Sequence, residues 1–171
     1  QFIQVFLIKK FDYTEMQLGL FVAYFAVWVA ISQGVFLRFV THFATPVKIL
    51  LYSIPLFAFS FYAMSFPNHH KWLYALLPLL TIFQGLTFPN LLAILSNSSA
   101  DNVQGEVIGI NQSVQSLATA IPPLAGGFLM TLSPKAPMLL GCYCALMAWI
   151  IYLVYYFKNR ESFSEEEDET I

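Results

Sequence analysis

Five apolar stretches, each about long enough to cross a bilayer, occupy most of this sequence, and Lys48 is the only charged residue within them. The hydrocarbon core of a membrane is about 30 Å thick, so a spanning helix needs roughly 20 apolar residues. In lipid every backbone polar group must be paired within its own segment, which predicts a bundle of helices. The stretches are Met16–Leu37, Val47–Phe66, Trp72–Leu95, Ile108–Leu132 and Met138–Phe157.

The composition excludes whole classes of function. Hydrophobic residues make up 58% of the chain and charged residues only 11%, far from the values of a soluble domain. Soluble enzymes and nucleic-acid binders are therefore excluded, which leaves transporters, channels, membrane enzymes and membrane scaffolds. Six of the ten acidic residues fall in the last eleven positions. We therefore expect a transmembrane bundle over residues 1–160 and a disordered, acidic, cytoplasmic tail over residues 161–171.

The first eight residues form a shorter apolar run. Eight helical residues reach only about 12 Å, which is too short to span a membrane. The run Gln1–Ile8 also lacks the basic start and cleavage site of a signal peptide. We interpret it as the end of a helix whose beginning is missing, and the chain as a C-terminal piece of a longer protein.

No set of residues predicts catalysis, a cofactor or a metal site. His69 and His70 are adjacent in a loop, with no second cluster at the spacing of metal ligands. Cys142 and Cys144 are two residues apart on a predicted helix, so they point to nearly opposite sides. The sequence has neither a nucleophile elbow nor a phosphate-binding loop. We therefore do not expect an enzyme.

The informative signal is polarity without charge in Ile108–Leu132. On a helical wheel its amides and hydroxyls share an arc of about 140°. Gly105 and Gly109 begin a neighbouring stripe of small residues, and bulky apolar residues take the opposite side. Two interpretations stand side by side, namely polar contacts that join helices and the wall of a transport pathway. The polar residues are Asn111, Gln112, Gln115, Ser116 and Thr119.

The stretch Trp72–Leu95 repeats this pattern more sparsely, with Gln84, Thr87 and Asn90 spaced three apart. Pro89 removes one backbone donor and frees the carbonyl one turn earlier. A plain kink explains such a proline, but broken polar helices at membrane depth also mark substrate sites in secondary transporters. These three residues are the candidates for a substrate cavity.

The region from Phe88 to Gly127 resembles the tenth helix, the following loop and the eleventh helix of the major facilitator superfamily. The resemblance is carried by Phe88-Pro89-Asn90, by Gln104-Gly105-Glu106 with Gly109, Ser113 and Ser116-Leu117, and by Pro122-Pro123-Leu124 with Gly126-Gly127. The pattern is closest to the tetracycline-efflux-like branch of drug/proton antiporters. Gly34, Arg38 and Lys48 sit where that family has a loop motif, of which the Asp and second Gly are absent here.

The resemblance implies an all-α membrane protein with five full transmembrane helices plus a truncated one, the C-terminal half of a major facilitator fold. It implies that Gln84, Thr87 and Asn90 face a central cavity and that Asn111 and Gln115 lie between the two halves. It places the bulky second span at the periphery, facing lipid. Helix counting puts Arg38 and Glu169 on one side of the membrane and Lys71 on the other, and the resemblance makes the Arg38 side cytoplasmic.

The expected function is export of a small molecule, a drug or a metabolite, by alternating access coupled to protons. The expected partners are the lipid bilayer, the missing N-terminal half and the substrate, in a bacterial inner membrane. The alternative is a membrane scaffold or accessory subunit without transport activity, in which the amides only join helices.

Overall fold

The computed structural model describes residues 4, 7–8, 11–66, 69–100, 102–133 and 135–159. Over these residues every regular element is a helix, and α2, η1 and α3 run on as one continuous rod. The π-helix η1 is a local widening of that rod. The elements are α2 Glu15–Ile31, η1 Ser32–Phe36, α3 Leu37–Phe43, α4 Pro46–Ala63, α5 His70–Asn97, α6 Gln104–Leu132 and α7 Ala136–Lys158.

All five predicted spans are helices, and the predicted helical membrane bundle is confirmed. Four segments of the described chain are long and apolar enough to cross a membrane, namely Glu15–Phe43, Pro46–Ala63, Lys71–Asn97 and Ala136–Lys158. The fifth, α6, has 29 residues, which is long enough, but its amides and hydroxyls make it less apolar than the others. Most of Gln1–Ile8 and the whole tail 161–171 lie outside the described residues.

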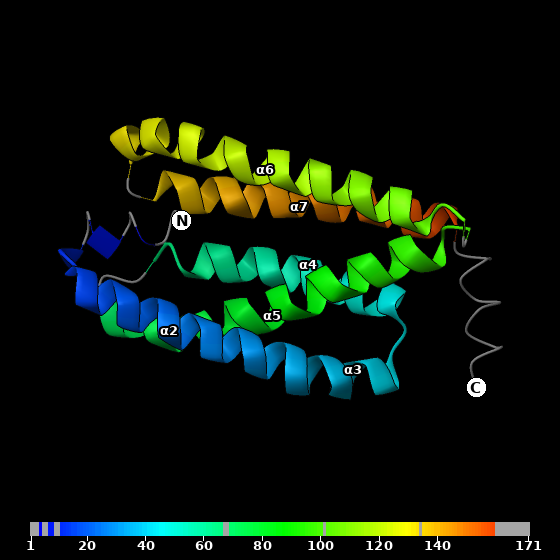
Figure 1. Ribbon diagram of the computed structural model, residues 1–171. Helices are drawn as coiled ribbons and strands as arrows, with labels where there is room; N and C mark the ends of the chain where they lie inside the picture. The colour runs from blue at the N-terminus through cyan, green and yellow to red at the C-terminus, as the bar shows by residue number, and fades with distance from the viewer. Residues whose placement is uncertain are drawn as a thin grey trace.

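The helices run back and forth along one direction (Figure 1). The end of α3 and the start of α4 lie at the same end of the bundle as the last turns of α5 and α7. Arg38, in α3, and Lys71, at the start of α5, are therefore at opposite ends, as helix counting predicts. Glu169 lies outside the described residues.

The core lies where α2, α4 and α5 meet. Phe21, Met64, Leu73 and Leu77 are buried there in one hydrophobic cluster. Beside it, desolvation and a hydrogen bond to Tyr74 raise the pKa of Tyr13 to about 12. The Tyr13 phenol is therefore protonated at physiological pH.

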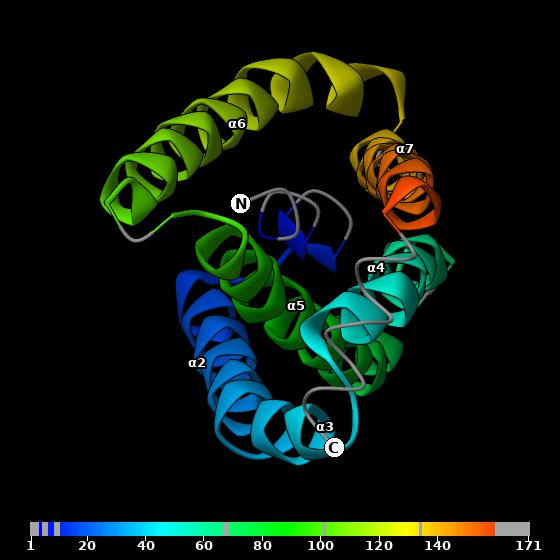
Figure 2. The same ribbon diagram turned by 90° about the vertical axis from the view of Figure 1, so that its right-hand side faces the viewer.

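Helix α4 is the most buried of the four apolar segments, with 39% of its most apolar window buried. It packs between α5 and α7, as the end-on view shows (Figure 2). Only one stripe, including Tyr52, Leu56 and Phe59, remains exposed. The expectation that this span faces lipid therefore holds for that stripe alone, because the rest of α4 fills the space between its two neighbours.

Two prolines are matched by side-chain donors from a neighbouring helix. Pro55 has no N–H to donate to the carbonyl of Leu51, and Trp149 Nε1 of α7 donates to that oxygen at 3.0 Å. Pro78 likewise frees the carbonyl of Tyr74, which accepts a hydrogen bond from the Tyr24 hydroxyl of α2 at 3.2 Å. Buried carbonyls need partners in a membrane, so these aromatic donors fix α7 and α2 against the kinked helices.

Helix α6 stands apart from the other helices. It contacts α5 and α7, its neighbours in the chain, and arches away from the packed group (Figure 2). Ile110, Val114 and Leu117 on its apolar side are 58%, 61% and 65% exposed, so that side has no close packing partner among the described residues. On the polar side, Gln112, Ser116 and Thr119 are exposed, whereas Asn111 and Gln115 are half-buried.

Candidate functional site

The three candidate cavity residues of α5 occupy different environments. Gln84 is half-buried and has no hydrogen-bond partner among the described residues. Thr87 Oγ1 lies 2.7 Å from the Phe83 carbonyl oxygen and 3.0 Å from Ser53 Oγ of α4. Asn90 is only 2% exposed, and its Nδ2 donates to the Leu86 carbonyl at 2.6 Å. Thr87 therefore bridges two helices, whereas Gln84 keeps its amide available.

Asn90 also lines a groove between the α2–α3 rod and α5, which we call the Arg38 groove. Its volume is about 640 Å³. Two amides, a hydroxyl and a guanidinium contribute to its wall, and the wall contains no carboxylate. The lining residues are Gln33, Gly34, Leu37, Arg38, Thr41, Pro46, Pro89, Asn90 and Ala93.

The π-helix η1 shapes one wall of the Arg38 groove. Ser32 is fully buried and donates to the Ile82 carbonyl of α5 at 3.1 Å. It packs directly on Gly85, where an added Cβ would lie 2.8 Å from Ser32 Cβ and in still closer contact with Oγ. The next two residues, Gln33 and Gly34, are exposed toward the groove. Single π-turns inside α-helices occur frequently at functional sites.

Sequence reasoning did not predict this widening. The available signal was the Ser32-Gln33-Gly34 triplet, a polar and small interruption in an otherwise apolar span. Hydropathy averages over such a triplet, and the residue on α5 that packs against it can be identified only from the three-dimensional arrangement.

The candidate interface residues all lie on the open side of α6. Asn111 and Gln115 are half-buried, and the other three are exposed. The hydroxyls bond within their own helix: Ser116 donates to the Gln112 carbonyl at 2.8 Å, and Thr119 to the Ser116 carbonyl at 2.8 Å. No described residue of another helix forms a hydrogen bond with these five side chains, although Gln104, two turns before Asn111 on the same side, donates to the Ser96 carbonyl of α5 at 3.3 Å. The five side chains are therefore available to contact another surface.

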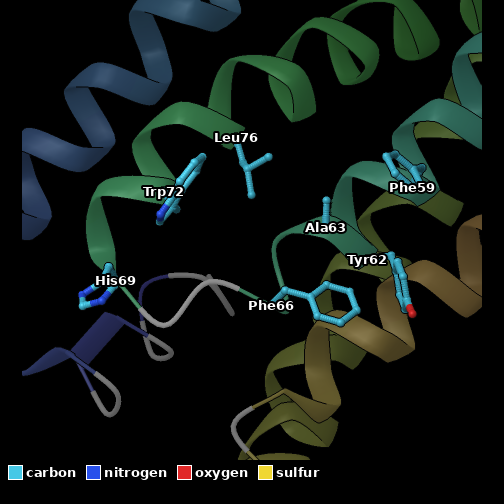
Figure 3. Close-up of a pocket in the computed structure, with 7 residues that line it drawn as sticks. All are labelled: Phe59, Tyr62, Ala63, Phe66, His69, Trp72 and Leu76. Atoms are coloured by element: carbon cyan, nitrogen blue, oxygen red, sulfur yellow. The ribbon is translucent and has the colours of Figure 1, made fainter.

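An aromatic groove lies between the end of α4 and the start of α5, at the opposite end of the bundle from α3 (Figure 1). Figure 3 shows its lining residues. Phe59, Tyr62 and Phe66, from α4 and the turn after it, line this groove together with Trp72 and Leu76 of α5. Its volume is about 530 Å³, and His69 is at its rim. Exposed ring faces of this kind hold flat aromatic molecules or organic cations.

Metal binding finds no support in the described part of the chain. Over those residues no group of three His, Cys, Asp or Glu side chains could hold a metal ion. Cys142 is buried and Cys144 exposed on α7, in keeping with their predicted opposite directions.

Comparison with known families identifies the fold that the helices build. The family model of the Major Facilitator Superfamily matches residues 2–170 of this sequence, which is nearly the whole chain. The chain belongs to the major facilitator superfamily. No curated protein and no solved structure gave a significant match.

Membership fixes the broad function of this major facilitator protein. It is an integral membrane protein of a superfamily of transporters that move small molecules and are not enzymes. The bilayer and a small-molecule substrate are accordingly its partners. The helices are arranged as a partial bundle of this fold.

Proposed function

We propose that this protein exports an apolar or amphipathic small molecule by alternating access, with the described helices forming one of two facing bundles. The observation that carries the proposal is the open polar face of α6. Its Ser and Thr hydroxyls bond to their own helix, and its amides have no partner in the described residues of other helices. A surface of this kind suits an interface that slides, because its contacts form and break without leaving a buried polar group unpaired.

The opposing surface in this proposal is a second six-helix bundle of the same protein. Asn111, Gln112, Gln115, Ser116 and Thr119 would meet it. Gly109 has no atom within 4 Å of an added Cβ, so the backbone of α6 is accessible to a closely packed partner helix. Small residues permit such close approach between membrane helices.

Gln84 and Thr87 form the cavity wall in this proposal, with Asn90 at its margin where it also lines the Arg38 groove, and Gln84 makes the principal contact with the substrate. Its amide is half-buried and unpaired among the described residues, whereas Thr87 already joins α5 to α4. An amide donates and accepts hydrogen bonds without carrying charge. That chemistry suits an amphipathic molecule, including a lipophilic organic cation, better than a small inorganic ion.

The resemblance to drug/proton antiporters supports coupling to a proton gradient across a bacterial inner membrane. The acidic side chains of the described residues are Asp12, Glu15 and Glu106, none of them deep within an apolar span. A carboxylate that carries the coupled proton would therefore belong to the second bundle.

The test measures two quantities on the complete protein in proteoliposomes, with the lipophilic cation ethidium as probe. Gln84→Ala should weaken equilibrium binding about two- to tenfold, because one cavity hydrogen bond is worth about 0.5–1.5 kcal/mol. Gln115→Leu should slow gradient-driven transport with less effect on binding, since it changes the moving interface.

The control is Tyr143→Phe, at an exposed position of α7 outside both proposed surfaces. It should leave ethidium binding and transport unchanged. If normally expressed Gln84→Ala behaves like this control, Gln84 is not a cavity residue. If the unmodified protein shows no uptake or release driven by a pH gradient, the scaffold alternative is favoured.

A further inference from the structure

We propose that the Arg38 groove binds the headgroup of an anionic phospholipid, with the phosphate on Arg38 and a headgroup hydroxyl on Asn90. Arg38 has no acidic partner among the described residues, and the groove wall beside it holds no carboxylate. A guanidinium binds phosphate through two parallel hydrogen bonds, which is the strongest anion contact that a side chain makes.

Asn90 supplies the second point of recognition. The residue is 2% exposed, and only its Nδ2 has a partner, the Leu86 carbonyl at 2.6 Å. No fully buried side-chain oxygen or nitrogen of the described chain lacks a partner, so the Asn90 Oδ1 keeps some accessible surface, and Asn90 is one of the residues that line the groove. This oxygen only accepts hydrogen bonds. The ligand must therefore combine an anion with a hydroxyl or ammonium donor, as the headgroup of phosphatidylglycerol does.

The deep end of the groove lies just inside the boundary between hydrocarbon and headgroups. Helix α5 has 28 residues, which corresponds to about 42 Å and exceeds the hydrocarbon core by about 6 Å on each side. Asn90 is seven residues from the end of that helix at Asn97. It therefore lies close to the boundary between hydrocarbon and headgroups, where a long Arg side chain extends toward water.

A second groove on the other side of α3 offers a path for an acyl chain. It measures about 210 Å³ and is lined by apolar residues of α3, α4 and α5, among them Val40, Leu56 and Phe83, with Lys48 in its wall. Phe83 is two turns deeper along α5 than Asn90. Basic pockets between helices at the cytoplasmic surface are typical binding sites for anionic headgroups. A soluble phosphate ester would use Arg38 but not the apolar groove, so we commit to a lipid.

The experiment titrates the purified complete protein, in a neutral maltoside detergent, with phosphatidylglycerol and with phosphatidylcholine, and counts bound lipids by native mass spectrometry. We expect a clear preference for phosphatidylglycerol. Arg38→Gln should lower that affinity about five- to tenfold, since one cation at the membrane surface contributes on the order of a factor of five. The matched control is Lys158→Gln, a cation at the same end of the bundle but outside the groove, which should change the affinity less than twofold.

A second variant tests the groove without changing any charge. No atom lies within 4 Å of an added Cβ at Gly34, so the side chain of Gly34→Leu fits into the open groove and occupies it. It should lower phosphatidylglycerol binding as strongly as Arg38→Gln, whereas Arg38→Lys should lose less, because the ammonium keeps the charge but not the two parallel hydrogen bonds. This variant keeps the proposal testable even if Arg38→Gln does not fold.

Four results would overturn the proposal. Equal losses in Arg38→Gln and Lys158→Gln would mean general surface attraction. Equal binding of phosphatidylcholine or phosphatidylethanolamine would remove the need for a net negative charge. Competition by glycerol phosphate at the affinity of the lipid would assign Arg38 to a soluble ester. A marked gain in lipid affinity on deleting residues 161–171 would assign the groove to the acidic tail.

Discussion

Helices α5 and α6 are similar in length and both carry polar residues at membrane depth, but the structure treats them in opposite ways. Thr81, Thr87 and Asn90 of α5 are buried or half-buried within the packed group, and Thr87 reaches another helix. The hydroxyls of α6 are exposed and bond to their own backbone. Thr81 and Asn90 also bond to their own backbone, so the contrast lies in their burial and in the one link from Thr87 to α4, whereas the polar side chains of α6 remain available for a surface outside the bundle.

The largest expected loss of stability is at Gly85 of α5, and Gly109 of α6 provides the comparison. Gly85→Ala places a methyl group against Ser32, whose hydroxyl is held by the Ile82 carbonyl and cannot move aside freely. We expect the free energy of unfolding to fall by about 2–3 kcal/mol, the cost of overpacking a tight contact. Thermal unfolding of the purified protein in detergent measures it.

Gly109→Ala is the matched control, because an added Cβ there meets nothing within 4 Å. Alanine is the better helix former by about 1 kcal/mol, so this change should leave stability unchanged or raise it slightly. Two substitutions of the same type should therefore have opposite signs. Similar losses at both positions would show that α6 is packed as closely as α5, and the contrast between the helices would be wrong.

The next effect tests the hydrogen bond between α7 and the kink of α4. Trp149→Phe removes the donor to the Leu51 carbonyl, which Pro55 cannot satisfy. An unpaired buried carbonyl costs about 1–3 kcal/mol, and we expect a loss of about 1–2 kcal/mol in the free energy of unfolding.

A double-mutant cycle separates this mechanism from simple loss of packing. In a Pro55→Ala background the new backbone N–H can donate to the Leu51 carbonyl, so Trp149→Phe should cost about 1 kcal/mol less than in the native background. Additive losses in the two single variants would mean that the indole stabilises α7 by packing alone. Tyr143→Phe, at an exposed position of the same helix, serves as the neutral control.

The span positions could be predicted from sequence because lipid imposes one physical rule on the whole segment. Trp72–Leu95 was predicted, and α5 runs from His70 to Asn97. The polar side of α6 also followed from its period of 3.6 residues. Each of these features depends only on residues close together in the chain.

The contacts between helices could not be predicted in the same way. The sequence shows that Pro55 and Pro78 free two carbonyls, but the donors are 98 and 50 residues away from those oxygens. Tyr152 illustrates the same limit. Its hydroxyl donates to the Val47 carbonyl of α4 at 2.9 Å, a partner 105 residues away in the sequence. These hydrogen-bond partners depend on which helices pack side by side.

The smallest expected change in stability comes from removing a threonine hydroxyl. Two threonines are compared, one whose hydroxyl contacts another helix and one whose hydroxyl bonds only to its own helix. Thr87 links α5 to Ser53 of α4, and Ser53 is 2% exposed. Thr87→Val keeps the branched shape and removes this link, so we expect stability to fall by about 0.5–1.5 kcal/mol. Thr119 on α6 donates only to the Ser116 carbonyl of its own helix, and Thr119→Val should change stability by less than about 0.5 kcal/mol.

Transport separates the two threonines in the reverse order if α6 faces a second bundle. Thr119→Val alters the proposed moving interface, so it should slow gradient-driven ethidium transport although the fold is unaffected. Thr87→Val should lower the unfolding temperature and have a smaller effect on the transport rate than Thr119→Val. A Thr119→Val protein with normal stability and normal transport would show that this hydroxyl faces neither a partner nor a pathway. The open side of α6 would then extend no further toward its C-terminal end than Gln115 and Ser116.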